Sequence, residues 1–326
     1  MVSYKTAPPG ELLVKVVSYY NVVPGKNKSQ EKFDILTKFI NGVNAAGDEG
    51  VLHKQSNIVN CDVGVIQGWQ HDRGKSAPHL QLRQKVIETQ TNANKYVVSG
   101  DANLFLYANK SNQPHHYLRY SFNGIFPSTG IYCDDTPDPK RWQQISKDTG
   151  IELQDYKTKG KTIVVCMQRE GGWSMGPMSI VNWTKNVVTE IRKHTDRKII
   201  LRPHPGDKKA LLTYLPVLQQ FFKSAADVKI SQFGTPIEQD LHKAWAVVNH
   251  NSSSVVGPII QGYHAFITDP EKSQCTDVSH TDFSKIETPQ QFDRQAWLER
   301  ISMFHWKFSE LDNGTCWKHM RNYVRQ

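Results

Sequence analysis

The second half of the chain repeats one pattern, in which a short apolar run rich in β-branched residues is followed by a polar loop and a helical stretch. The apolar runs cover 162–167, 198–202, 228–231, 246–249 and 265–268. The helical stretches between them cover 179–194, 208–222, 236–244 and 254–263. Strands that alternate with helices form a parallel sheet covered by helices. The pattern therefore predicts a doubly wound α/β domain, a class that binds ligands outside the carboxyl ends of its strands.

The first half shows the same alternation less regularly. Its apolar runs cover 12–23, 63–69 and 96–99, and its helical stretches cover 30–46, 79–91 and 141–146. Periodicity lapses over 109–139, where we expect loops. Since KTKGK at 157–161 resembles a linker, we expect one domain over 1–156 and a second over 157–288. An aromatic-rich helical segment, 289–326, is expected to pack back on the first domain.

Composition excludes several classes of protein. A length of 326 residues favours two domains, and no apolar run reaches the roughly 20 residues of a membrane span. Because the N-terminus also lacks a signal peptide, we expect a cytoplasmic protein with no membrane span. The five cysteines include no CxxC pair, and the adjacent His115 and His116 match no ligand spacing, so we expect no metal.

Two further observations bear on function. The 40 Lys and Arg residues outnumber the 31 Asp and Glu residues, and the resulting charge of +9 suits a polyanionic partner or simply a soluble basic protein. The chain contains no GxGxxG, GxxxxGK[ST], HExxH or GxSxG motif. Dehydrogenases, P-loop nucleotide triphosphatases, zincins and hydrolases with a nucleophile elbow therefore lose their usual support.

Three polar loops follow strands of the second half. After the first strand come Gln168, Arg169, Gly171 and Gly172, which would let a backbone approach a bound group and supply a charge for phosphate. An ordinary glycine turn is the alternative.

The second loop holds Arg202 and then His204 between two prolines, the latter of them Pro205. The prolines would fix the histidine for ligand contact, unless it is only a surface residue in a proline turn.

The third loop contains Asn249, Ser252, Ser253 and Ser254 at the start of a helix. Serine hydroxyls and free amides at this place form an anion site, although capping alone would need one serine.

The histidine-proline pair and the serine cluster resemble the HP and SS motifs of GT-B glycosyltransferases, especially bacterial sialyltransferases and capsule-type transferases of the Kdo and polysialic acid pathways. The stretch 306–317 also resembles the ending of glycosyltransferase-like proteins of tailed phages. The resemblance implies two facing Rossmann-like domains with parallel sheets and a C-terminal helix that crosses back. It also implies a nucleotide-sugar donor, first a UDP-sugar, and no bound cofactor or metal. His204 and Pro205 would contact the nucleotide, and Ser252, Ser253 and Ser254 the phosphate.

An inverting transferase also needs a base, which in this fold comes from the N-terminal, acceptor-binding domain. The candidates are Asp101 and Asp72, with His71 as a third. Asp101 follows Gly100 at the end of a predicted strand. Loop solvation or helix capping would equally explain both aspartates.

The acceptor that would explain the positive charge is double-stranded phage DNA carrying hydroxymethylcytosine, modified in the host cytoplasm. A flipped base would need side chains that fill its place and contact the strand, and we expect these contacts from Trp69, Gln70, Arg73 and Lys75. A capsule or lipid-linked glycan is the alternative acceptor. A non-catalytic nucleotide-binding module is the alternative to an enzyme.

Overall fold

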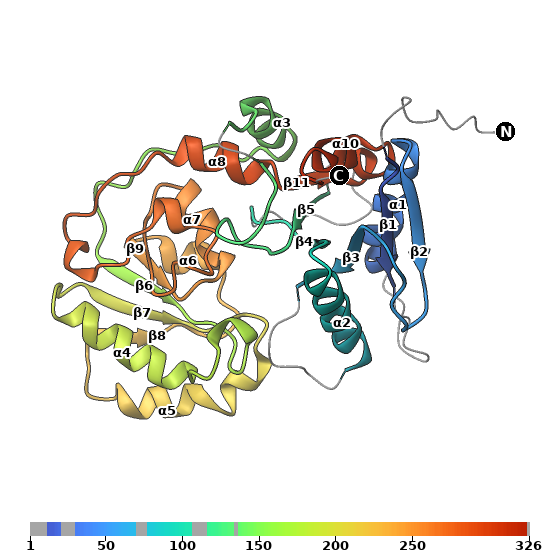
Figure 1. Cartoon of the computed structure of the whole chain (residues 1–326). Helices are drawn as coiled ribbons and strands as arrows, with labels where there is room; N and C mark the ends of the chain where they lie inside the picture. Colours follow the sequence, from blue (N-terminus) through green and yellow to red (C-terminus); the bar gives the residue numbers. More distant parts are fainter. Residues whose placement is uncertain (1–11, 21–29, 70–76, 106–115, 134–135, 325–326) are drawn as a thin grey trace. The chain divides into compact units, whose positions relative to one another are not determined.

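A computed structural model describes residues 12–20, 30–69, 77–105, 116–133 and 136–324. The chain forms two compact units (Figure 1). The first comprises 1–103, 107–149 and 299–326, and the second comprises 104–106 and 150–298. Residues 150–156 and 289–298 therefore lie in the second unit, whereas we expected the division near 157 and the return of the chain at 289.

The described part of the first unit contains a six-stranded sheet in the order β11-β5-β4-β3-β1-β2. Its strands are β1 (Lys15–Tyr19), β2 (Glu49–His53), β3 (Val63–Gln67), β4 (Tyr96–Ala102), β5 (Tyr117–Phe122) and β11 (His305–Lys307). The four strands β1 to β4 pair in parallel, whereas β5 pairs antiparallel with both β4 and β11. The first unit is therefore a mainly parallel sheet with an antiparallel edge.

Helices cover both faces of this first sheet. They are α1 (Gln30–Ala45), α2 (Pro78–Asn92), α3 (Pro139–Thr149), α9 (Phe308–Asp312) and α10 (Thr315–Arg321). On one face, Phe39 of α1 stacks on Tyr120 of β5 and meets Trp317 of α10 edge-on. On the other face, Leu82 and Val86 of α2 pack against the apolar side chains of β1, β3 and β4. The burial of aromatic side chains from α10 thus makes the C-terminal segment part of the core of the first unit.

Three strands of the first unit were not predicted. β5 lies within 109–139, where we expected loops, and β11 lies within the segment that we expected to be helical. β5 has the sequence YLRYSF and is buried at every position, so it shows no alternation of apolar and polar residues. β2 was also missed, and β11 has only three residues, too few to give a periodic signal.

The second unit is the doubly wound domain that the sequence predicts. Its described strands form one parallel sheet in the order β10-β9-β6-β7-β8. They are β6 (Thr162–Cys166), β7 (Lys198–Arg202), β8 (Val228–Ile230), β9 (Ala244–Asn249) and β10 (His264–Ile267). The helices are α4 (Ile180–Arg192), α5 (Tyr214–Phe221), α6 (Ile237–Leu241), α7 (Val256–Ile260) and α8 (Arg294–Ser302), and α8 continues into the first unit.

The core of the second unit follows from the alternation of side chains along its strands. Ile163 and Val165 of β6 point to the face that α4 and α5 cover, where Trp183 and Leu218 are buried against them. Val164 of β6 points to the opposite face and is also fully buried. In Figure 1 the helices α6 and α7 lie across the sheet from α4 and α5. Burial on both faces explains why β6, β9 and β10 are continuous apolar runs, whereas the edge strand β8 is only half-buried.

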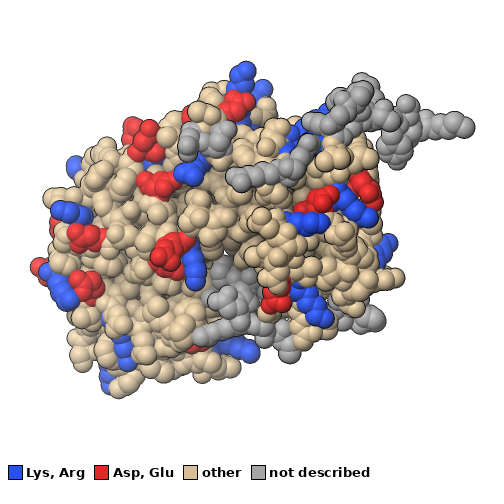
Figure 2. All heavy atoms as spheres, in the orientation of Figure 1, with Lys and Arg blue, Asp and Glu red and all other residues tan. Residues whose placement is uncertain are grey.

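Surface charge is mixed on the face drawn in Figure 2. Lysine and arginine side chains lie beside aspartate and glutamate side chains there, and they do not gather into one uninterrupted basic patch. Among the described helices, none has both the length and the apolar character needed to cross a bilayer. The described residues also contain no group of three metal-ligating side chains close enough to share an ion.

Candidate functional site

The loops that the sequence singles out meet at one edge of the second sheet. The strands β9, β6 and β7 are neighbours, and β10 lies beside β9. All of them are parallel, so their carboxyl ends share one edge. We call the polar side chains at the ends of these four strands the carboxyl-edge site. The structure brings the Gln168, His204 and Ser252 loops together there, as expected for a doubly wound sheet.

A chain of amide hydrogen bonds joins three of these loops. Gln168 Nε2 donates to Ser174 Oγ and to Asn251 Oδ1, both at 2.7 Å. Asn251 Nδ2 donates in turn to Asp269 Oδ2 at 2.8 Å. Gln168 and Asn251 are 6% and 3% exposed, so these bonds are shielded from water. The loops after β6, β9 and β10 are therefore held in a fixed relation.

His204 is set in one orientation and one tautomer. Its Nδ1 accepts a hydrogen bond of 3.0 Å from the backbone N–H of Gly206. Nδ1 is thus unprotonated, and Nε2 carries the ring proton. Burial lowers the pKa of His204, the Arg169 guanidinium lowers it further, and Asp207 opposes the shift. The histidine is therefore neutral at pH 7 and offers its Nε2–H as a donor.

Gly206 leaves room for the end of the Arg169 side chain near the histidine. A Cβ atom at Gly206 would come within 2.6 Å of Arg169 Nη2 and 3.1 Å of His204 Cε1. The exposed Arg169 comes from the β6 loop, so a cation and a neutral N–H donor from two strands stand together. Such a pair suits a phosphate or a nucleotide.

Backbone contacts brace the glycine loop after β6. The N–H of Glu170 donates to Asp207 Oδ2 at 3.0 Å, and Glu170 Oε2 accepts from the N–H of Ile180 at the start of α4. Gly171 has φ +63°, a left-handed conformation that favours glycine. The first loop is therefore tied to the histidine loop through Asp207.

The serine cluster divides its roles. Ser252 Oγ accepts from the N–H of Ser254 at 3.2 Å and caps the 3-10 turn Ser253–Val255. Ser254 follows in the same turn and is also half-exposed. Asn249 Nδ2 donates to the carbonyl oxygen of Ser252 at 2.5 Å. Capping thus accounts for one serine, as the alternative interpretation required, and it leaves Ser253 half-exposed at the site.

Arg202 has a different partner from the one that we expected. Its Nη1 lies 2.6 Å from Asp240 Oδ2, in a pair whose side chains are 11% and 9% exposed. The Ser231 hydroxyl also donates to Asp240. This contact holds Arg202 against α6, while the exposed Pro205 follows His204 at the edge.

Sequence reasoning missed the contribution of the loop after β10. Trp183 Nε1 donates to Thr268 Oγ1 at 2.9 Å, and Thr268 Oγ1 lies 2.7 Å from His250 Nδ1. Burial lowers the pKa of His250, although Asp269 opposes the shift. The strand before Thr268 was predicted, so examining its carboxyl end as well would have found Asp269.

In the first unit, Asp101 lies near the end of β4. Its Oδ2 is 2.9 Å from Arg119 Nη2 on the paired strand β5, and its Oδ1 accepts from the N–H of Ala102. Gly100 is required by packing, since a Cβ there would come within 2.9 Å of Tyr120 and Ile35. Asp101 is therefore a partly exposed carboxylate with a fixed partner.

The other candidates of the first unit stand as follows. Trp69 follows β3 and packs partly buried against the apolar cluster under α2. Gln70, Asp72, Arg73 and Lys75 lie outside the described residues, as does His71.

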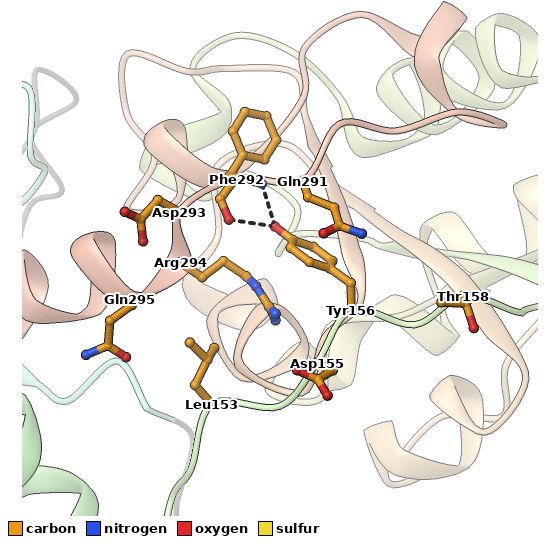
Figure 3. Close-up of a pocket in the computed structure, with 9 residues that line it drawn as sticks. All are labelled: Leu153, Asp155, Tyr156, Thr158, Gln291, Phe292, Asp293, Arg294 and Gln295. Carbon is orange, nitrogen blue, oxygen red and sulfur yellow. Dashed lines mark hydrogen bonds between the residues drawn. The ribbon is translucent and has the colours of Figure 1, made fainter.

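A separate cavity of about 490 Å³ opens in the second unit (Figure 3). It is lined by Leu153, Asp155, Tyr156, Thr158, Gln291, Phe292, Asp293, Arg294 and Gln295. Arg294 lies over the Tyr156 ring and donates to the carbonyl oxygens of Ile259 and Gln154. The neighbouring Lys157 N–H donates to Gly262, just before β10 begins. The cavity is thus at the amino edge of the sheet, apart from the carboxyl-edge site.

The fold is similar to two solved structures from Thermosulfurimonas dismutans. KpsC, β-Kdo 2,4 transferase, aligns with a TM-score of 0.53 at 9% identity, covering 91% of this chain and 93% of that one. KpsC, β-Kdo 2,7 transferase, aligns with a TM-score of 0.51 at 14% identity, covering 95% and 100%. No protein-family model and no curated protein sequence matches this chain.

These similarities define a class of fold. The chain has the mixed α/β fold of GT-B glycosyltransferases, with parallel sheets and covering helices, as the sequence predicted. At identities of 9% and 14% the similarity concerns the fold alone.

Proposed function

We propose that the protein is a glycosyltransferase that binds a nucleotide-sugar donor at the carboxyl-edge site. The observation that carries this proposal is the meeting of Arg169 with the neutral His204 where the loops of β6 and β7 converge. The fold similarity to two Kdo transferases supports the same class of reaction.

The chemistry of sugar transfer assigns a role to each group. The transition state resembles an oxocarbenium ion, and negative charge grows on the departing phosphate. Arg169, the Nε2–H of His204 and the hydroxyl of Ser253 are the groups that would stabilise this charge. Asp101, and Asp72 as the second candidate, would take the proton of the acceptor hydroxyl. The proposal needs no bound cofactor or metal.

The donor test begins with a thermal-shift panel of UDP, CDP, CMP and GDP compounds with their sugars, because a ligand that binds only the folded state raises Tm. UDP-sugars are the first candidates. We expect His204→Ala to weaken binding of the best nucleotide by about 1 to 3 kcal/mol, since it removes a polar partner. The control is His242→Ala, an exposed histidine of the same unit. Equal affinity in the folded His204→Ala protein would remove the assignment.

For the acceptor we propose hydroxymethylcytosine in double-stranded phage DNA. The supporting observations are the net charge of +9 and the resemblance of 306–317 to phage proteins. A capsule or lipid-linked glycan is the second candidate, because the two structurally similar proteins are Kdo transferases. A non-catalytic nucleotide-binding module would bind donor without turnover.

The acceptor test incubates the protein with the best donor and either hydroxymethylcytosine duplex or a glycan acceptor. We expect added sugar mass on the nucleoside, and DNA affinity that falls steeply with salt because bound lysine and arginine release counterions. Unmodified cytosine duplex is the control. Sugar added to the glycan alone would replace the DNA acceptor with the second candidate. Binding of the donor with neither transfer nor hydrolysis would favour the non-catalytic module.

A further inference from the structure

Two buried amide oxygens in the carboxyl-edge site have no hydrogen-bond partner among the described residues. They are Gln168 Oε1, just after β6, and Asn249 Oδ1, at the end of β9. The two residues are 6% and 0% exposed, and their strands are neighbours in the sheet. A buried acceptor without a donor costs folding free energy, so such groups in a native protein call for an explanation.

The orientation of Gln168 is fixed by a carboxylate two residues away in the hydrogen-bond chain. Ionised Asp269 only accepts, so Asn251 must turn its Nδ2 toward Asp269. Asn251 Oδ1 then faces Gln168, so Gln168 must donate from its Nε2. The same Nε2 donates to Ser174 Oγ. Gln168 Oε1 is therefore left as an acceptor by the network itself.

The orientation of Asn249 follows from a simpler contact. Its Nδ2 donates to the backbone carbonyl oxygen of Ser252, a group that can only accept. The amide cannot turn over without opposing two oxygens. Asn249 Oδ1 is thus also left as an acceptor, in a residue that is fully buried.

We infer that Gln168 Oε1 and Asn249 Oδ1 form a subsite that binds hydroxyl or N–H groups of the nucleotide-sugar donor, and that Asp269 positions it through Asn251. This assignment rests on the proposed function. A phosphate at neutral pH has no proton to donate and would be repelled by both oxygens. Asn249 therefore does not belong with the phosphate-binding serines, where the sequence grouped it. The donor groups that fit are sugar hydroxyls or the N–H groups of a nucleobase.

The test uses Gln168→Met and Asn249→Leu, which keep the approximate shape of each side chain and remove the acceptor oxygen together with the amide N–H donors. Calorimetric titration compares the nucleotide sugar with the free nucleotide, and circular dichroism checks the fold. We expect each variant to lose about 10- to 100-fold in affinity for the nucleotide sugar, the usual effect of an unpaired donor. Gln239→Met, at an exposed glutamine of α6, is the matched control and should bind normally.

The two ligands separate the two sources of the donor groups. A loss seen only with the nucleotide sugar assigns the subsite to sugar hydroxyls, and an equal loss with the free nucleotide assigns it to the nucleoside. Asp269→Asn should also lower the affinity for the nucleotide sugar, because an amide at position 269 no longer fixes the orientation of the Asn251 side chain.

The remaining outcomes count against the inference. Unchanged affinity in both folded variants, as ordered water alone at these oxygens would give, overturns the subsite and leaves the proposed function standing. A wild-type protein that binds no nucleotide sugar overturns the proposed function, and this subsite with it.

Discussion

At His204, a single backbone contact decides which ring nitrogen meets a ligand. The sequence predicted a histidine mounted between prolines, and the structure adds the N–H of Gly206, which occupies Nδ1. The Arg169 guanidinium lies where a Cβ atom of residue 206 would come within 2.6 Å of it. Sequence spacing places these residues at one edge of the sheet. It cannot give the tautomer or the close approach, because both arise from contacts between loops.

Asp101 carries the prediction that belongs to the first unit. If it is the general base, Asp101→Asn should reduce turnover by about 10² to 10⁴ while donor affinity stays unchanged, since the amide cannot accept the proton. Turnover is measured under saturating donor, together with Tm.

The ion pair with Arg119 supplies the competing explanation for Asp101. Were Asp101 there only to hold that guanidinium, whose Nε has no partner among the described residues, Asn would lower Tm and leave the turnover of folded protein intact. Arg119→Met is the control for loss of the pair, because it removes the guanidinium and keeps the Asp101 carboxylate.

At the scale of elements, the two sheets were unequally predictable. The strands β6, β9 and β10 of the second sheet are buried on both faces and alternate with helices, so each appears as an isolated apolar run. The first sheet is completed by β5 and β11, each of which has a charged residue that pairs with a residue of another element. Arg119 of β5 pairs with Asp101, and Lys307 of β11 with Asp148. No pattern within β5 or β11 could reveal partners so distant in sequence.

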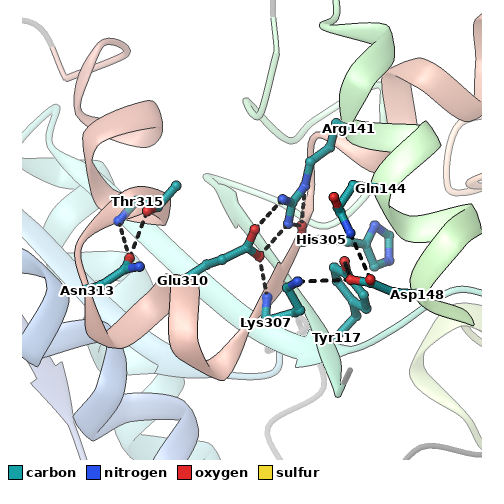
Figure 4. Close-up of polar contacts among 9 residues, drawn as sticks. All are labelled: Tyr117, Arg141, Gln144, Asp148, His305, Lys307, Glu310, Asn313 and Thr315. Carbon is teal, nitrogen blue, oxygen red and sulfur yellow. Dashed lines mark hydrogen bonds and ion pairs between the residues drawn. The ribbon is translucent and has the colours of Figure 1, made fainter. Parts of the chain in front are cut away.

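One such contact joins α3 to the C-terminal segment (Figure 4). Arg141 Nη1 lies 2.6 Å from Glu310 Oε1, and Nη2 lies 2.7 Å from Oε2. The guanidinium also donates to the His305 carbonyl oxygen and lies over the Trp306 ring. The two charged side chains are 10% and 17% exposed. This pair fixes the segment that supplies β11 to the first sheet.

We expect Arg141→Met to destabilise the first unit by about 3 kcal/mol, because it leaves the largely buried Glu310 carboxylate without its charged partner. Urea unfolding followed by tryptophan fluorescence measures the loss. Adding Glu310→Gln to this variant should recover part of it. A single-variant loss below about 1 kcal/mol, typical of exposed pairs, would contradict the role assigned to this contact.

At the scale of the whole molecule, neutral histidines are built into both units. Burial lowers the pKa of His264 in the second unit to about 4 and that of His305 in the first to about 3. His264 Nε2 bonds the Lys157 carbonyl oxygen, and the ring stacks on Tyr156. The sequence shows thirteen histidines but not which ones are buried. Because these histidines are buried as neutral rings, we expect the fold to lose stability in acid.

The sign of the effect follows from linkage. In the unfolded chain these histidines take up a proton near pH 6.5, whereas in the folded chain they do so only at a lower pH. The free energy of unfolding is therefore highest above pH 6.5 and decreases as the pH falls toward the folded-state pKa values. For His264 the loss is on the order of 3 kcal/mol by pH 4. Urea unfolding at pH 7.5, 6.5, 5.5 and 4.5, values chosen to span roughly this window, should show little change between the first two and a falling free energy of unfolding below pH 6.5. His264→Gln keeps a donor for Lys157 but cannot take up the proton, so its curve should be flatter, whereas His242→Gln should follow the wild type. Parallel curves for His264→Gln and the wild type would mean that other groups cause the acid sensitivity.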